Sequence, residues 1–129
     1  MDRSGDYEID TKTASGARGY DYMLGGTDNY AVDRVAVDRL EALLPGSKAM
    51  ARNNRRFLER AVTVLTKEYG IRQFIDIGSG LPTQNNVHQI AQNIDPTCKV
   101  VYVDLDPLVL AYQKLHSLAE NEKGAALLE

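Results

Sequence analysis

Apolar residues recur with a helical period in two adjacent segments, residues 28–44 and 47–69. A Pro-Gly pair ends the first segment, while Ser47 is expected to cap the second and Gly70 to end it. We expect one apolar face of each helix to point into the core. The face expected for the first helix comprises Val32, Val35, Ala36, Leu40, Leu43 and Leu44. The face expected for the second comprises Met50, Phe57, Leu58, Ala61, Val62 and Leu65.

The pattern then changes to short runs of β-prone apolar residues. Runs of this kind at residues 72–77 and 99–104 predict strands that are buried on both faces of a parallel sheet. Each run is followed by a helical segment, at residues 84–94 and 106–119, and residues 125–129 resemble the beginning of a third strand. Such alternation predicts an α/β fold with right-handed crossovers and, in this chain, an incomplete sheet.

Three segments are expected along the chain. Residues 1–17 are polar, rich in Asp, Ser, Thr and Gly, and show no hydrophobic period, so we expect a disordered arm. Residues 18–70 form an N-terminal helical cap, and residues 71–129 form the first part of the α/β domain. A chain of 129 residues has room for one domain at most, with a modest core.

Composition excludes several classes of function. A net charge of −3 gives no support to nucleic-acid binding, and the single cysteine, Cys98, allows no intramolecular disulfide or cysteine-based zinc site. His88 and His116 lie on different predicted helices without a second ligand one turn away, so no metal site is expected. Because no apolar run approaches the ~18 residues of a membrane span and no signal peptide is evident, we expect a cytoplasmic protein without membrane contact.

The candidate chemistry lies where the first predicted strand ends. Asp76 is followed by the turn Gly78-Ser79-Gly80, which removes side chains where a ligand must come close. A carboxylate there would repel a dinucleotide's diphosphate, and Thr83 replaces the third glycine of the dinucleotide motif. A cationic cofactor without phosphate fits better. The candidate is S-adenosylmethionine, which carries ammonium and sulfonium groups.

A second carboxylate supports this interpretation. Asp104 ends the second predicted strand, where it could accept hydrogen bonds from ribose hydroxyls. Asp106 and Pro107 then mark the start of the next helix. The alternative is that the acids Asp76 and Asp104 merely cap helices.

The double glycine Gly25-Gly26 also has two interpretations. It is either a helix C-cap followed by a new N-cap at Thr27 or Asp28, or a place where the backbone lies against a ligand. The neighbouring tyrosines at positions 20, 22 and 30 could cover an adenine or a sulfonium, or pack in the core.

A row of cations at i, i+4 spacing follows the second helix. Its members are Lys48, Arg52, Arg56 and Arg60. Like charges so spaced repel one another. We therefore expect the row to face either acids of the preceding helix, namely Asp33, Asp38 and Glu41, or an acidic ligand.

Several stretches together resemble one family. Residues 20–30, 51–58 and 70–83, continued by residues 86–88 and 101–107, are similar to bacterial S-adenosylmethionine-dependent methyltransferases first catalogued as a domain of unknown function. The Leu-Gly-Gly-x-Asp-Asn element in the first stretch is specific to that family. The resemblance implies a Rossmann-like methyltransferase sheet preceded by two helices.

The resemblance also implies a set of cofactor-binding residues. Asp76, Gly78 and Gly80 would contact the methionine end of S-adenosylmethionine and Asp104 its ribose, with Gly25 and Gly26 as a flap over the cofactor. The full set expected to bind the cofactor is Asp76, Gly78, Ser79, Gly80, Asp104, Leu105, Asp106, Gly25, Gly26 and Tyr30.

The chain departs from the family in length. Members of the family are roughly twice as long, and in their sheets the strand at residues 74–77 lies between the strand at 100–104 and a fourth strand that this sequence does not contain. We therefore expect self-association through the exposed strand, or a need for the missing C-terminal half. The expected function is methyl transfer to an unknown acceptor, without an assignable base. The alternative is a non-catalytic cofactor-binding or regulatory fragment.

Overall fold

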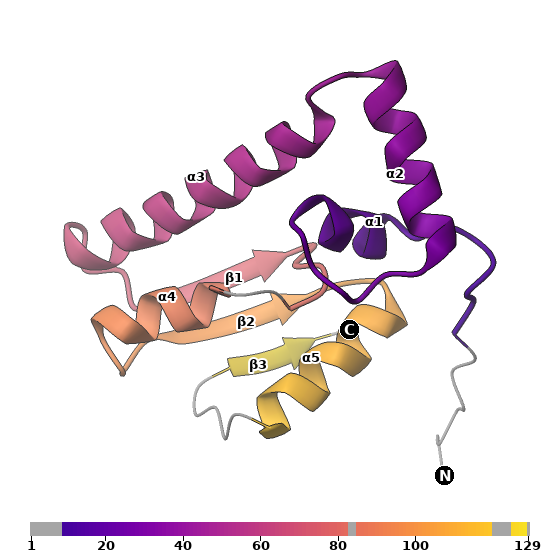
Figure 1. Cartoon of the computed structure of the whole chain (residues 1–129). Coiled ribbons are helices and arrows are strands. Elements are labelled where there is room, and N and C mark those ends of the chain that lie inside the picture. The colour runs from indigo at the N-terminus through magenta and orange to yellow at the C-terminus, as the bar shows by residue number, and fades with distance from the viewer. Residues whose placement is uncertain (1–8, 83–84, 120–124, 129) are drawn as a thin grey trace, which may run out of the picture.

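The computed structural model describes residues 9–82, 85–119 and 125–128 of the chain (Figure 1). Its elements follow the order α1 (Gly16–Met23), α2 (Ala31–Leu43), α3 (Ser47–Lys67), β1 (Gln73–Ile77), α4 (Val87–Ile94), β2 (Lys99–Val103), α5 (Pro107–Ala119) and β3 (Ala125–Leu128). The loop expected at residues 120–124 lies outside the described residues.

The strands form one parallel sheet in the order β1-β2-β3. In register, Phe74 lies opposite Val100 and Asp76 opposite Tyr102. Helix α4 connects β1 to β2, and α5 leads from β2 towards β3 (Figure 1). The predicted α/β class, the alternating order and the third strand are thus confirmed.

One face of the sheet carries the core. Residues from α3, α4 and the strands make a cluster of buried side chains: Val62, Val87, Ala91, Cys98, Val100 and Tyr102, with Leu58, Phe74 and Ile90 packed against it. The helix predicted at residues 84–94 therefore packs an apolar face on the core. Burial raises the pKa of the Cys98 thiol, as expected of a small core side chain.

The opposite face of β1 is bare. Ile75 is 70% exposed and Ile77 is 79% exposed, whereas Phe74 and Asp76 on the other face are partly buried. The expectation of a strand buried on both faces is wrong for the described residues. Since β1 is also an edge strand, it leaves both an apolar surface and one side of its backbone uncovered.

The inward face predicted for α2 is largely wrong, whereas the face predicted for α3 is confirmed in part: Val62 is buried and Leu58 packs against the core. On α2 the predicted core residues Leu40, Leu43 and Leu44 are exposed. On α3 the largest predicted core residues, Met50 and Phe57, are 64% and 62% exposed. The buried residues outside the predicted faces are small or polar: Asp33, Val37, Ser47, Ala51 and Thr66. Hydrogen bonds allow these polar side chains to be buried. The spacing of apolar residues in the sequence does not indicate such hydrogen bonds.

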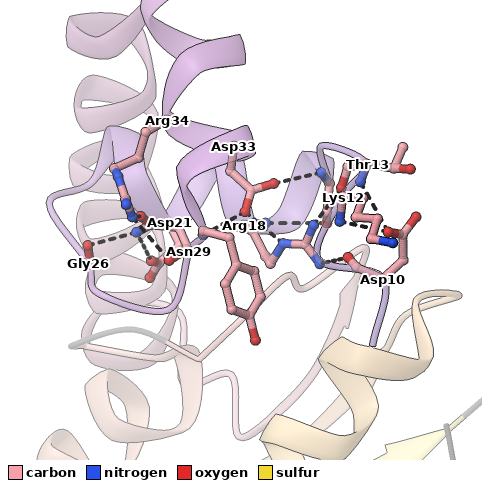
Figure 2. A network of polar contacts seen from close by, with 11 residues as sticks. Asp10, Lys12, Thr13, Arg18, Asp21, Gly26, Asn29, Asp33 and Arg34 are labelled. Carbon is pink, nitrogen blue, oxygen red and sulfur yellow. Dashed lines mark hydrogen bonds and ion pairs between the residues drawn. The ribbon is translucent and has the colours of Figure 1, made fainter. Parts of the chain in front are cut away.

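A buried ion pair between α1 and α2 explains the polar interior of the N-terminal helices (Figure 2). Arg18 Nε donates to Asp33 Oδ2 at 2.8 Å, and Asp33 is fully buried. The same carboxylate accepts the backbone N–H groups of Ser15 at 2.9 Å and Tyr30 at 2.8 Å. Burial alone would raise the pKa of Asp33, but these hydrogen bonds outweigh it and leave the pKa below the ordinary 3.8.

Arg18 also holds the segment that precedes α1. Its two terminal nitrogens donate to the carbonyls of Asp10 at 3.0 Å and Thr13 at 2.7 Å. Helix α1 begins at Gly16, inside the segment 1–17 that the sequence assigns to a disordered arm. Residues 1–8 of that arm lie outside the described part of the chain. No sequence period indicates the contacts of residues 10–15, because they go to backbone carbonyls.

Glu41 joins α2 to α3. Its carboxylate accepts from Ser47 Oγ at 2.6 Å and from the backbone N–H groups of Lys48 and Gly46, each at 2.9 Å. These hydrogen bonds lower the pKa of Glu41 to about 2. The N-cap position belongs to Gly46, whose φ is +98°, so the expectation that Ser47 caps α3 is wrong. Glu41 does this work from the preceding helix.

Replacing Asp33 by Ala should destabilise the fold by about 3–5 kcal/mol, because it leaves the Arg18 guanidinium buried without a counter-charge. The wild-type advantage should be complete above pH 3.8 and decline as the pH falls through the lowered pKa of Asp33. Urea unfolding at several pH values measures both effects. The control is Asp38→Ala, which removes the exposed ion pair with Lys48 and should change stability far less. Equal losses in both variants would contradict the role given to Asp33.

Candidate functional site

The glycine turn after β1 crosses the end of β2. Gly78 and Gly80 have φ angles of +69° and +71°, in the left-handed region that favours glycine. The backbone N–H of Gly78 donates to the Val103 carbonyl at 2.7 Å, which fixes the turn to the neighbouring strand. A Cβ added at Gly78 or Gly80 would meet no atom within 4 Å. The turn is therefore an open cradle.

Asp104 ties this turn to the start of α5. One carboxylate oxygen accepts the N–H of Gly80 at 2.9 Å, and the other accepts the N–H of Asp106 at 2.9 Å. Asp106 in turn accepts the N–H of Leu108 at 2.9 Å and caps α5, as its sequence position predicts. Each oxygen of Asp104 still has a second lone pair. Leu105, between the two acids, is 95% exposed.

Asp76 lies on the same edge of the sheet. Burial raises the pKa of its carboxyl; the positive charge of Arg55 opposes this shift and the negative charge of Asp104 adds to it. The two carboxylates therefore act on each other, and together they make the open turn attractive to a cation. The sequence also allowed that Asp76 and Asp104 merely cap helices. In the described residues neither of them does, and Asp106 caps α5.

Sequence reasoning missed Gln113 of α5. Its side-chain amide donates to Ser79 Oγ at 3.3 Å and to the Gly80 carbonyl at 3.2 Å. Gln113 is buried, and it holds the glycine turn against α5. The available signal was a lone polar residue next to the apolar face of a predicted helix.

The double glycine ends α1 in a Schellman motif. The N–H of Gly26 bonds to the carbonyl of Asp21 at 2.9 Å, and that of Gly25, whose φ is +83°, to Tyr22 at 3.0 Å. A Cβ on Gly26 would lie 2.0 Å from Asp21 Oδ1. The helix-cap interpretation therefore describes what the structure shows. The new N-cap expected at Thr27 or Asp28 is wrong, because α2 has its N-cap at Tyr30.

The side chain of Asn29 holds the loop that contains Gly25 and Gly26 (the glycine loop) in place. Asn29 donates from its amide nitrogen to Asp21 Oδ2 at 2.9 Å and to the Gly26 carbonyl at 3.0 Å (Figure 2). Arg34 donates to the side chain and carbonyl oxygens of Asn29 at 2.9 and 3.2 Å. Tyr30 lies with its ring under the Arg18 guanidinium, 5.0 Å from it.

A cleft of about 910 Å³ lies between this loop, α3, α5 and the segment after the glycine turn. Its lining comprises Asp21, Leu24, Gly25, Gly26, Thr27, Asp28, Arg52, Arg55, Arg56, Glu59, Pro82, Asn85, Gln89, Tyr112 and Leu115. Of the predicted cofactor-binding residues, Gly25 and Gly26 line it and the other eight do not. Arg55 connects the two regions, because it lines the cleft, donates to the Asn85 carbonyl and acts on Asp76.

The remaining candidates have structural roles. His88 is buried, and its ring and backbone N–H both bond to the Tyr102 hydroxyl. Tyr20 bonds to the Ala51 carbonyl at 3.3 Å, and Tyr22 to Asp38 at 3.3 Å. Within the described ranges, no His, Cys, Asp or Glu side chains are grouped as a metal ion requires. No helix in that part of the chain has the length and apolar character to cross a membrane.

Comparison with known proteins decides the family. The chain matches the family model described as S-adenosyl methyltransferase over residues 2–128. It belongs to that family. The resemblance drawn from the sequence is thereby confirmed, and the cofactor of the family is S-adenosylmethionine. A search of curated proteins gives no match to the chain.

Two crystal structures show how this S-adenosyl methyltransferase family member relates to longer proteins. A DUF574 family protein from Streptomyces avermitilis MA-4680 is 45% identical with a TM-score of 0.86, and the match covers 95% of this chain and 47% of that one. A methyltransferase candidate from Thermobifida fusca YX is 41% identical with a TM-score of 0.84, and the match covers 93% of this chain and 45% of that one. The chain thus spans about half the length of these proteins.

Replacing Gly26 by Ala should lower the free energy of unfolding by about 1–3 kcal/mol, because the new Cβ overlaps Asp21 and forces the loop or the Asp21–Asn29 hydrogen bond to move. Chemical denaturation measures the loss. Gly16→Ala is the matched control, since Gly16 begins α1 and an added Cβ meets nothing within 4 Å. The control should be neutral or slightly stabilising. An unchanged Gly26→Ala protein would show that the loop is not built as described.

Proposed function

We propose that this chain is the cofactor-binding part of an S-adenosylmethionine-dependent methyltransferase. The observation that carries the proposal is the open Gly78–Gly80 turn between two interacting carboxylates, Asp76 and Asp104, at the carboxyl ends of β1 and β2. Ligands of open α/β sheets bind at this edge. Two acids disfavour a diphosphate and favour a cation, which fits the cofactor of the family.

The side chains of the turn suit different parts of S-adenosylmethionine. Asp76 would attract the ammonium or sulfonium group beside the glycines. Asp104 would accept ribose hydroxyls with the lone pairs that Gly80 and Asp106 leave over. Leu105, almost fully exposed, would lie against the adenine. These assignments, with those of Ser79, Gly25, Gly26 and Tyr30, remain predictions, as does the division at residues 17 and 70.

When bound, S-adenosylmethionine supplies an electrophilic methyl group on a sulfonium. A nucleophilic atom of the acceptor attacks that methyl in line, and the carbon–sulfur electron pair returns to sulfur. The contribution of these residues is to hold the cofactor and to shield its reactive end from water, so a protein base is optional. We assign no residue of the described chain as such a base.

A second candidate function rests on the bare face of β1. With Ile75 and Ile77 exposed on an edge strand, the chain would act as a cofactor-binding module that is completed by a further half or by a partner. The matches cover 47% and 45% of the two proteins of known structure, so each has additional chain beyond the matched part. Under this alternative the described residues bind the cofactor and catalysis needs the other part.

Calorimetric titration with S-adenosylmethionine, its homocysteine product and NAD tests the cofactor. We expect micromolar dissociation constants for the first two and much weaker binding of NAD. Asp76→Asn should reduce this preference without unfolding the chain. Tighter binding of NAD would overturn the electrostatic argument. No heat with millimolar S-adenosylmethionine would contradict both candidates, because each requires the described residues to bind the cofactor.

In the same titration, Asp104→Ala should weaken S-adenosylmethionine by about 1.5–3 kcal/mol, the range for a hydrogen bond to a charged group. Asp104→Asn keeps one oxygen that can accept the N–H of Gly80. This variant therefore distinguishes loss of a contact to the ligand from loosening of the glycine turn. Asp95→Ala is the control, because Asp95 pairs with Arg72 before β2 begins. If all variants bind like the wild type, Asp104 does not recognise the ribose.

The bare face predicts self-association of the chain on its own. Sedimentation at micromolar concentration should show dimers or larger species. Lysines in place of Ile75 and Ile77 together should shift the distribution towards monomer, since charges oppose contact between apolar faces. Val35→Lys is the control, because Val35 is half exposed on α2, away from the sheet. A compact wild-type monomer would contradict this expectation.

A further inference from the structure

The acids of α2 do not neutralise the cationic row on α3. Asp33 is buried with Arg18, and Glu41 is taken up by the first turn of α3. Asp38 pairs with Lys48 at 2.7 Å, which accounts for one member of the row. The sequence left two partners open for the row: acids of the preceding helix, or an acidic ligand. Of the four cations, Lys48 alone has a partner among those acids within the described residues.

Arg52 and Arg56 instead line the cleft. They lie one helical turn apart on α3, so their like charges repel each other. In the described part of the chain, no carboxylate lies within ion-pair distance of either guanidinium. Arg60, the last member of the row, is exposed and does not line the cleft.

The acids of the cleft are directed to other groups. Asp21 accepts from Asn29 at 2.9 Å, and Glu59 accepts from the Asn85 amide at 3.3 Å. Asp28 belongs to the glycine loop, where burial and the charge of Asp21 raise the pKa of its carboxyl. The part of the wall formed by α3 carries three arginines, Arg52, Arg55 and Arg56, against the one carboxylate of Glu59, and is therefore positive overall.

We propose that Arg52 and Arg56 bind an anionic group, a carboxylate or phosphate, of a ligand seated in this cleft. Two guanidinium groups one turn apart present forks of N–H donors that match the oxygens of such a group. A cleft of about 910 Å³ has the size of a site for a small molecule. The bound anion would also relieve the repulsion within the row.

The anion has two possible sources, and naming them rests on the proposed function. One is the carboxylate of the methionyl group of S-adenosylmethionine, which would reach the cleft past Arg55. The other is an acidic group on the methyl acceptor. The chemistry recognised by the two arginines is the same in both cases, and ligand choice separates them.

The test compares three proteins: the wild type, the double variant Arg52→Gln/Arg56→Gln, and Arg60→Gln as a control from the same row. Calorimetry measures S-adenosylmethionine and methylthioadenosine, which keeps the nucleoside and lacks the carboxylate. Nuclear magnetic resonance titration with inorganic phosphate follows the backbone signals of Gly25, Gly26 and Asn85. Arg60→Gln should behave like the wild type throughout.

If the anion is the methionyl carboxylate, the double variant should lose tenfold or more in affinity for S-adenosylmethionine and none for methylthioadenosine. If it belongs to the acceptor, both affinities should be unchanged, and the saturable phosphate shifts should disappear in the double variant. The proposal is overturned if the three proteins agree in every titration, or if Arg60→Gln reproduces the double variant. A wild type that binds phosphate but not S-adenosylmethionine would refute the proposed function and leave the anion site standing.

Discussion

Parallel pairing of β1 with β2 is the constraint on which the candidate site depends. With Ile77 opposite Val103, both strands end at the same level, so the glycine turn and Asp104 leave the sheet side by side. Backbone hydrogen bonds from the turn to Val103 and to the Asp104 carboxylate then hold it open. Neither carboxylate could act on the other if the register moved by a residue, because alternate side chains point to opposite faces. The electrostatic character of the site follows from sheet geometry.

A different kind of interaction holds the N-terminal helices. Arg18 and Asp33 bury an ion pair that joins α1, α2 and the segment at residues 10–15. Its hydrogen bonds offset the cost of desolvating both charges. The pair also determines which acids remain for the cationic row, since Asp33 is fully buried with Arg18 and makes no ion pair with the described residues of α3. The cleft therefore keeps a positive wall because the interior of the neighbouring helices is polar.

The sequence predicts the sheet better than it predicts the helical cap. Phe74, Val100 and the apolar side of α4 follow periods that reflect burial, so strands, order and the glycine turn are recovered. Leu43, Met50 and Phe57 have the same apolar character and are nevertheless exposed, because the cap buries hydrogen-bonded polar residues in their place. The role of Gln113 depends on Ser79 and Gly80, which are distant in sequence. The Asp21–Gly26 contact depends on the space around the Gly26 Cα atom. A one-dimensional pattern contains neither kind of information.

The bare strand and the cleft place different demands on the rest of a longer protein. Covering Ile75 and Ile77 requires only an apolar surface with a free strand edge, and any chain that supplies one would restore an ordinary sheet interior. The cleft is lined by residues of α3, α5 and the glycine loop, all within residues 9–119. Recognition of an anion there needs no further strand. We therefore propose that cofactor contacts and the selection of ligand charge reside in the described residues, whereas covering the exposed face of β1 requires additional apolar surface.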